Sequence, residues 1–160
     1  VHGILNNVIN PDYLILTAPT FQVNYPEFLK KLAKPLSSLA PNLRSFSNVT
    51  KNNLTNDKDV VKNYFNDPLV FRSITFRAGY EIIKAQDYVN SNIKNLNTET
   101  LVLHGDNDTI SPIQGSSELS KLENVKYIKV ENSKHEILNQ DTRMYALSEI
   151  YEWLKIKSLV

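Results

Sequence analysis

The sequence of 160 residues contains no cysteine, few glycines and almost no excess of charge of either sign. Without cysteine there is no disulfide framework, no thiolate metal site and no cysteine nucleophile. Lys and Arg number 18 and Asp and Glu 17, which leaves a formal net charge of +1. A protein that binds a run of phosphates needs a larger basic surplus than this. The composition therefore excludes thiol chemistry and argues against a nucleic-acid partner.

Long hydrophobic runs are also missing. No stretch reaches the roughly 18 apolar residues that a membrane-spanning helix needs, and the first residues lack the basic start and apolar run of a signal peptide. We therefore expect a soluble chain, although the absence of cysteine fits any compartment. With 41% hydrophobic residues, 160 residues suffice for one ordinary globular domain or for part of a larger one.

Three short apolar segments, at residues 13–17, 100–104 and 125–130, predict β-strands. The first two are continuously apolar, which is typical of strands covered on both faces of a parallel sheet. A helix is expected after Pro112, between the second and third strands, and a terminal helix is expected from Asp141, which can cap it. The apolar residues that predict the terminal helix are Met144, Leu147, Ile150, Tyr151 and Leu154, with Trp153 as a packing residue. The alternation of strands and helices indicates an α/β fold.

Between residues 18 and 97 this alternation stops. We expect short helical pieces there, broken by four prolines, which are Pro26, Pro35, Pro41 and Pro68. Asp57 can cap one piece, a second is indicated around residues 82–89, and residues 48–57 are expected to form a loop. An apolar stripe at helical spacing is formed by Phe28, Leu32, Leu36 and Leu39. Such a stripe favours the lining of a pocket over contact with a lipid surface.

Polar residues follow the second and third predicted strands. Residues 104–112 read His-Gly-Asp-Asn-Asp-Thr-Ile-Ser-Pro, and residues 131–135 read Glu-Asn-Ser-Lys-His. Catalytic groups gather beyond the carboxyl ends of the strands in open α/β sheets. An Asp and His135 on neighbouring strand ends are therefore expected to meet. Asp108 as an ordinary turn residue and His135 as a solvated loop residue are the structural alternatives.

Residues 101–112 resemble the acid turn of the α/β-hydrolases, in which Gly-x-x-Asp after a strand holds the carboxylate of the catalytic triad. By this match the acid is Asp108. Residues 127–135 resemble the last strand and the histidine loop of the same fold, which makes His135 the base. The order of acid and then histidine fits the order of the triad in that fold.

Further resemblance gives the subfamily. Residues 66–70, Asn-Asp-Pro-Leu-Val, and the following segment with Arg77 and Glu81 resemble the cap of monoacylglycerol lipases and lysophospholipases. Residues 13–19 resemble their sixth strand. The resemblance implies one incomplete α/β-hydrolase domain over residues 1–160. It would comprise a three-stranded parallel sheet with helices on both faces, a helical cap insertion at 20–97, and the acid and histidine part of the sheet at 98–160.

The implied activity is hydrolysis of lipid monoesters by a Ser-His-Asp mechanism, with no cofactor and no metal. The implied partners are a lipid ester substrate and, transiently, a membrane surface. Asp106, Asn107 and Asp108 lack the following glycine and distal glutamate of an EF-hand calcium loop. The three histidines share no short spacing typical of zinc ligands.

The nucleophile of this mechanism is not found in the sequence. In this fold the serine lies in Gly-x-Ser-x-Gly after the fifth strand, and none of the four glycines flanks a serine in that way. Ser116 and Ser117 follow Gly115, but they come after the acid, which is the wrong order for a nucleophile. We therefore expect the first ten residues to be the tail of the helix that follows the missing nucleophile. Alternatively, Val1, His2 and Gly3 are a remnant of the segment that starts the oxyanion loop.

Two functional hypotheses follow. The first is a lipid esterase whose acid and base lie in this chain. The second is a catalytically inactive fragment or interaction module with the hydrolase fold. In either case the first strand would present an unpaired edge, so we expect either a missing amino-terminal half or self-association.

Overall fold

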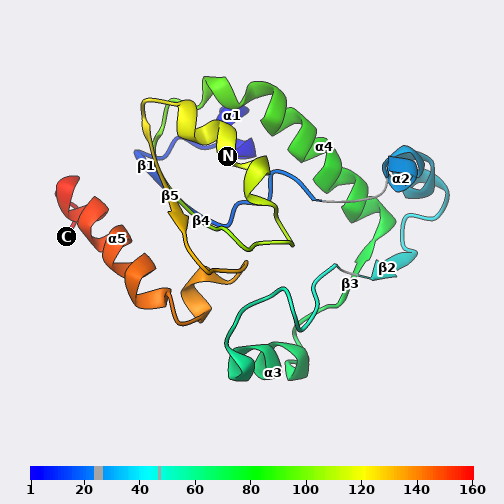
Figure 1. Ribbon diagram of the computed structural model, residues 1–160. Coiled ribbons are helices and arrows are strands. Elements are labelled where there is room, and N and C mark those ends of the chain that lie inside the picture. Colours follow the sequence, from blue (N-terminus) through cyan, green and yellow to red (C-terminus); the bar gives the residue numbers. More distant parts are fainter. Residues whose placement is uncertain (24–26, 47) are drawn as a thin grey trace.

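The computed structural model describes residues 1–23, 27–46 and 48–160 and contains a three-stranded parallel sheet (Figure 1). The strands are β1 (Tyr13–Thr17), β4 (Glu99–Gly105) and β5 (Val125–Val130), in the order β1-β4-β5. The first and third strands have the predicted bounds, and the second is one residue longer at each end. Because parallel strands end at the same edge, the segments after β4 and β5 emerge side by side.

Helices cover both faces of the sheet, as Figure 1 shows for α5 (Arg143–Ile156) and α4 (Phe76–Asn92). Successive side chains of a strand point to opposite faces. In β4, Leu101 and Leu103 therefore pack in the core beside α5, whereas Val102 packs in the core beside α4. The predicted class, a parallel α/β sheet with helices on both faces, is confirmed.

The face that the terminal helix α5 buries overlaps the predicted one only in part, at Ile150 and Leu154. Ala146 and Trp153 are buried in the core, and Ile150 and Leu154 pack against it, a spacing of i, i+4, i+7 and i+8. The other predicted residues, Met144, Leu147 and Tyr151, lie beside this face and are exposed. Trp153 is a packing residue, as predicted. Its ring contacts that of Tyr13 edge to face, with the two ring centroids 5.8 Å apart. The helix begins one residue after Thr142, so Asp141 is not its cap.

The segment between β4 and β5 contains no α-helix, which corrects the prediction. It forms two short 3₁₀ helices, η2 (Ile113–Gly115) and η3 (Ser117–Lys121). Their hydrogen bonds join residues three apart, such as Ser116 N–H to the Ile113 carbonyl. At the end of η2, a Cβ on Gly115 would lie 2.6 Å from Cβ of Gln22. The absence of a side chain there lets this segment approach the chain that leaves β1.

The long segment between β1 and β4 carries α2 (Glu27–Leu39), α3 (Lys58–Asn66) and α4, and a small antiparallel pair of strands, β2 (Arg44–Phe46) and β3 (Ser73–Thr75). Pro35 lies inside α2 and does not end it, contrary to prediction, and Pro26 lies outside the described residues. Asp57 caps α3 as predicted, since its carboxylate accepts hydrogen bonds from the N–H groups of Asp59 and Val60. The strands β2 and β3 were not predicted.

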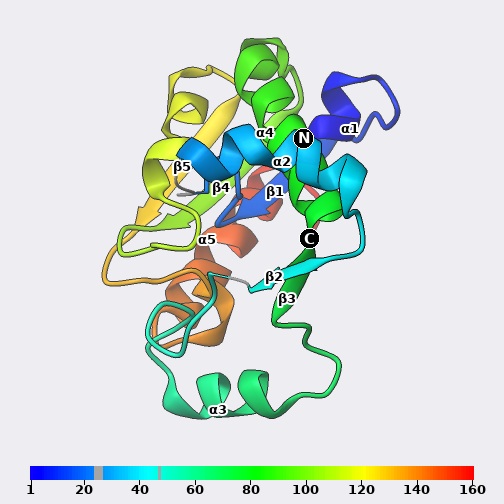
Figure 2. The same cartoon turned by 90° about the vertical axis from the view of Figure 1, so that its right-hand side faces the viewer.

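This segment extends to one side of the sheet in Figure 1, and Figure 2 shows α2 crossing α4 and α3 at the bottom of the view. A short helix, α1 (His2–Leu5), packs near α4. Among the described residues, none of the helices has both the length and the apolar character needed to cross a bilayer.

Candidate active site

The acid turn follows β4 directly. Asp108 lies at its centre, and one carboxylate oxygen, Oδ1, accepts hydrogen bonds from the N–H groups of Ile110 and Ser111, both at 2.9 Å. An aspartate that bonds the backbone two and three residues ahead holds a turn in a fixed shape. Because the side chain is fully buried, its second oxygen, Oδ2, is left for partners inside the protein.

The histidine turn lies directly against the acid turn. Asn107 N–H donates to the Ser133 carbonyl at 2.9 Å, and Asp106 N–H donates to the Val130 carbonyl at 3.1 Å. Gly105 makes this approach possible, because a Cβ there would lie 2.5 Å from the carbonyl oxygen of Lys134 and closer still to that of Ser133. Gly105 is therefore required by the close contact of the two backbones.

This contact brings Asp108 and His135 together, as the sequence predicts. His135 Nδ1 lies 2.8 Å from Asp108 Oδ2. The His135 side chain is 22% exposed. Within the described part of the chain, no protein atom bonds its other ring nitrogen, Nε2. The ring is thus anchored at Nδ1 by a buried carboxylate and has Nε2 available for a reacting group.

The charge of Asp108 is well stabilised. Burial by itself raises the pKa of a carboxyl, but hydrogen bonds from His104, His135 and the Ser111 N–H outweigh burial here. Together they hold the pKa of Asp108 well below its ordinary value of 3.8. Asp108 is therefore an anion at neutral pH, as a group that stabilises an imidazolium must be.

A second histidine, which the sequence analysis did not assign to the site, also faces Asp108. His104 is completely buried at the end of β4. Its Nε2 lies 2.8 Å from the Ser111 carbonyl and 3.3 Å from Asp108 Oδ2, and its Nδ1 lies 2.7 Å from Ser116 Oγ. The Ser116 hydroxyl in turn meets the Tyr127 hydroxyl at 2.6 Å. No sequence pattern joins these five residues, since their contacts form only when the turn folds back on the strand.

Residues 48–57, correctly predicted to be a loop, hold the histidine turn from outside. Glu136 N–H donates to the Leu54 carbonyl at 3.0 Å, and the Thr55 hydroxyl donates to the Asn139 carbonyl at 2.8 Å. Leu54 and Thr55 are both buried. The loop therefore fixes the backbone on which His135 stands, a role that its Asn-rich composition does not signal.

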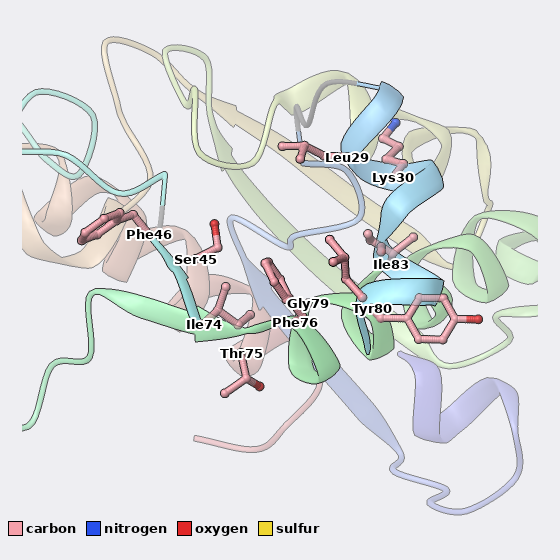
Figure 3. A pocket seen from close by; sticks show the side chains of 12 residues that line it. Leu29, Lys30, Ser45, Phe46, Ile74, Thr75, Phe76, Gly79, Tyr80 and Ile83 are labelled. Atoms are coloured by element: carbon pink, nitrogen blue, oxygen red, sulfur yellow. The ribbon is translucent and has the colours of Figure 1, made fainter. Parts of the chain in front are cut away.

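An apolar pocket lies in the segment between β1 and β4 (Figure 3). It is enclosed by α2, β2, β3 and the first turns of α4, and its lining includes Leu29, Leu36, Ile74, Phe76 and Ile83. The predicted stripe on α2 is divided: Leu36 lines the pocket, whereas the other three residues, Phe28, Leu32 and Leu39, are exposed.

The remaining polar candidates lie elsewhere. His2 is exposed and its ring meets that of Tyr88. Ser116 is buried and bonded to His104, and Ser117 is exposed on η3. Across residues 1–23, 27–46 and 48–160, no three His, Asp or Glu side chains converge in a way that could hold a metal ion.

Comparison with known proteins gives consistent matches. The model of a family described as serine aminopeptidase, S33, matches residues 5–142. A monoglyceride lipase homologue from Monkeypox virus is 29% identical over 148 residues, which cover 88% of this chain and 53% of that protein.

Two solved structures share the fold. A monoacylglycerol lipase from Paleococcus ferrophilus superposes with a TM-score of 0.86 at 23% identity, over 94% of this chain and 61% of that one. A soluble variant of the Saccharomyces cerevisiae monoglyceride lipase, in complex with a substrate analogue, superposes with a TM-score of 0.72 at 18% identity, over 88% and 54%. The chain thus spans a little over half the length of these relatives.

Proposed function

This chain belongs to the serine aminopeptidase S33 family of the α/β-hydrolases, and on that basis we propose that it carries the acid and the base of a hydrolase of lipid monoesters. The substrates would be monoacylglycerols or lysophospholipids. The monoglyceride lipase homologue and the lipase neighbours support this choice of substrate class. In this proposal residues 20–97 form the cap and residues 98–160 the acid and histidine part of the domain.

The contact between Asp108 and His135 carries the proposal. A buried carboxylate at 2.8 Å from Nδ1 holds the proton on that nitrogen and leaves Nε2 as the base. Nε2 would remove the proton of a serine hydroxyl while the serine oxygen attacks the ester carbonyl. The same proton would then pass from Nε2 to the leaving alcohol. Water would release the fatty acid in the second half of the reaction by the reverse use of the same base.

The serine would come from sequence outside these 160 residues, because they contain no Gly-x-Ser-x-Gly segment. In the fold of the family that segment follows a strand on the far side of β1 from β4. In this structure β1 pairs with β4 alone among the described strands. The free edge of β1 is therefore where the missing strand would pair.

The apolar pocket between α2, β2, β3 and α4 would hold the acyl chain. Its lining is dominated by aliphatic and aromatic side chains, which suit a hydrocarbon.

Ester turnover by the longest native polypeptide that contains these residues tests the proposal. His135→Gln and Asp108→Asn should each lower kcat for a nitrophenyl or monoacylglycerol ester by about 100- to 10,000-fold. His2→Gln is the matched control, because His2 is exposed and has no contact with Asp108. Unchanged turnover in His135→Gln would remove that residue from the reaction.

The absence of the serine motif specifically favours the second candidate, a non-catalytic module with the hydrolase fold. The same assay separates the two. If the longest native polypeptide without any substitution hydrolyses no ester, the second candidate, the non-catalytic module, is supported.

A further inference from the structure

His104 occupies an unusual place for a histidine, next to the last residue of the buried strand β4. Its side chain has no exposed surface, and a polar ring in such a place is costly unless both nitrogens are bonded. Both are bonded here, since Nε2 faces the Ser111 carbonyl at 2.8 Å and Nδ1 faces Ser116 Oγ at 2.7 Å. The ring is therefore held at two points.

The contacts determine where the proton of His104 lies. A carbonyl oxygen and a carboxylate oxygen can only accept hydrogen bonds, so Nε2, which faces both, must carry a proton. Nδ1 faces a hydroxyl, which can donate to it. The Ser116 hydroxyl has one proton and two acceptors in reach, the Ile113 carbonyl at 3.2 Å and the nearer Nδ1 at 2.7 Å, so it can donate to His104 while it accepts from Tyr127. The contacts fit a neutral ring with its proton on Nε2.

His104 and His135 face the same atom. Asp108 Oδ2 lies 3.3 Å from Nε2 of His104 and 2.8 Å from Nδ1 of His135. A second donor at a carboxylate oxygen withdraws charge from that oxygen and so weakens its attraction for the proton of the first donor. The state of His104 is thus coupled to the bond that orients His135.

We propose that His104 is a positioning residue, which fixes the acid turn through the Ser111 carbonyl and sets the strength of the Asp108–His135 hydrogen bond through the shared oxygen. The inference rests on the proposed function in taking Asp108 and His135 as the acid and base. Ser116 bonds Nδ1 of His104, and Tyr127 bonds Ser116, so these two residues fix the orientation of the ring.

Other ionisable groups near the pair are engaged elsewhere. Lys134 donates to the Thr55 carbonyl at 3.4 Å, and Glu136 accepts from the Asn139 amide at 2.7 Å. Asp106 accepts from the Ser133 N–H at 3.3 Å. Tyr127 reaches His104 only through Ser116. Besides His135, His104 is therefore the ionisable group that lies against Asp108 Oδ2 among the described residues.

The first test is the position of the proton in the chain as it stands. Long-range ¹H–¹⁵N correlation spectra distinguish the two ring nitrogens, and the sequence has only three histidines to assign. We expect the neutral Nε2–H form for His104. A ring protonated on Nδ1 alone would overturn the proposal, because Nε2 could not then donate to Ser111 or face Asp108 with a proton.

The second test replaces the donor. In His104→Leu we expect the Nδ1 proton resonance of His135 to move downfield. We also expect Asp108, followed by its carboxyl ¹³C resonance, to become about a tenfold weaker acid. His104→Gln keeps an N–H donor on a side chain of similar reach and should restore much of both signals. A loss of thermal stability with neither signal changed would show a merely structural residue and overturn the proposal.

A third pair of variants applies if His104→Leu does not fold. Ser116→Ala removes the partner of Nδ1, whereas Ser117→Ala changes the neighbouring exposed hydroxyl as a control. We expect only Ser116→Ala to move the His104 and His135 signals, and identical spectra for the two variants would contradict the proposal. All these signals are measured without ester turnover. They can therefore appear in a chain that hydrolyses nothing, which separates failure of this inference from failure of the proposed function.

Discussion

Asp108 makes the stability of the folded chain depend on pH in the acid range. Its pKa is well below 3.8 in the folded chain because the donors around it outweigh the effect of burial. A carboxyl with a lowered pKa stabilises the fold above its unfolded pKa, and this contribution is lost as the pH falls toward the folded pKa.

The free energy of unfolding should therefore fall by up to about 1.4 kcal/mol per pH unit below pH 4 through Asp108 alone. Asp108→Asn lacks this titration, so the difference in stability between the original chain and the variant should narrow as the pH is lowered from 5 to 2. Denaturant unfolding at several pH values measures it. A difference that stays constant over this range would contradict the assignment of a strongly bonded carboxylate.

Replacement of two glycines by alanine should change the stability of the chain in opposite directions. A Cβ at Gly105 would collide with the carbonyls of the histidine turn, whereas a Cβ at Gly79, within α4, meets no atom within 4 Å. Gly105→Ala should cost about 3 kcal/mol, the upper end of the cost of overpacking, and should part Asp108 from His135. Gly79→Ala should instead stabilise the chain by up to about 1 kcal/mol. Thermal or denaturant unfolding compares the stabilities of the two variants. Equal stabilities would show that the acid turn and the histidine turn can move apart to accept a Cβ at position 105 at little cost.

At the residue scale, the sequence was sufficient to predict that Asp108 and His135 meet, because both follow strands whose ends lie side by side. It was not sufficient for His104, whose partners Ser116 and Tyr127 lie 12 and 23 positions further along the chain (116 − 104 and 127 − 104). Leu54 was also missed as a support of the histidine turn, since its carbonyl meets Glu136 from a distant loop. Such contacts depend on the folded arrangement and leave no local pattern.

Among the elements, the terminal helix α5 was easier to predict than the face that it buries. In α5, Met144, Leu147 and Tyr151 share a helical spacing as good as that of the residues that pack on the sheet. Both spacings are apolar, so periodicity alone could not choose between them. The helix buries the face on which Ala146 packs in the core with Leu101 and Leu103 of β4 and on which the Trp153 ring contacts Tyr13.

The pocket between α2 and α4 can be tested with neighbouring positions of one helix. Gly79 lines the pocket, whereas the adjacent Ala78 is exposed and does not line it. Gly79→Phe should fill the pocket and weaken the binding of a fluorescent long-chain fatty acid by about tenfold or more, as the loss of one well-buried apolar contact implies. Ala78→Phe adds the same ring outside the pocket and should leave the affinity unchanged. Equal affinities for both variants would show that the acyl chain binds elsewhere.

At the scale of the whole molecule, the unpaired edge of β1 is the feature that most favours association with another strand. An unpaired strand edge is a template for another strand, and Ile15, in the middle of β1, is 36% exposed. We expect the isolated chain to associate with itself in a concentration-dependent manner. Ile15→Lys should shift it toward monomer by about tenfold in concentration, because a charge on an edge strand opposes pairing.

Leu69→Lys is the control for this prediction, since it adds the same charge at an exposed position between α3 and β3, outside the three-stranded sheet. Light scattering over a dilution series gives the result. A chain that is monomeric at all concentrations, or two variants that behave alike, would show that the β1 edge is protected in some other way.

The central claim is that Asp108 and His135 serve a serine that lies outside these residues. Labelling of the longest native polypeptide with a fluorophosphonate, followed by mass spectrometry of the labelled peptide, tests this most directly. The account predicts one labelled serine, in a Gly-x-Ser-x-Gly segment beyond residues 1–160, and the loss of labelling in His135→Gln. A labelled serine within residues 1–160, labelling that persists without His135, or no labelled serine at all would contradict it.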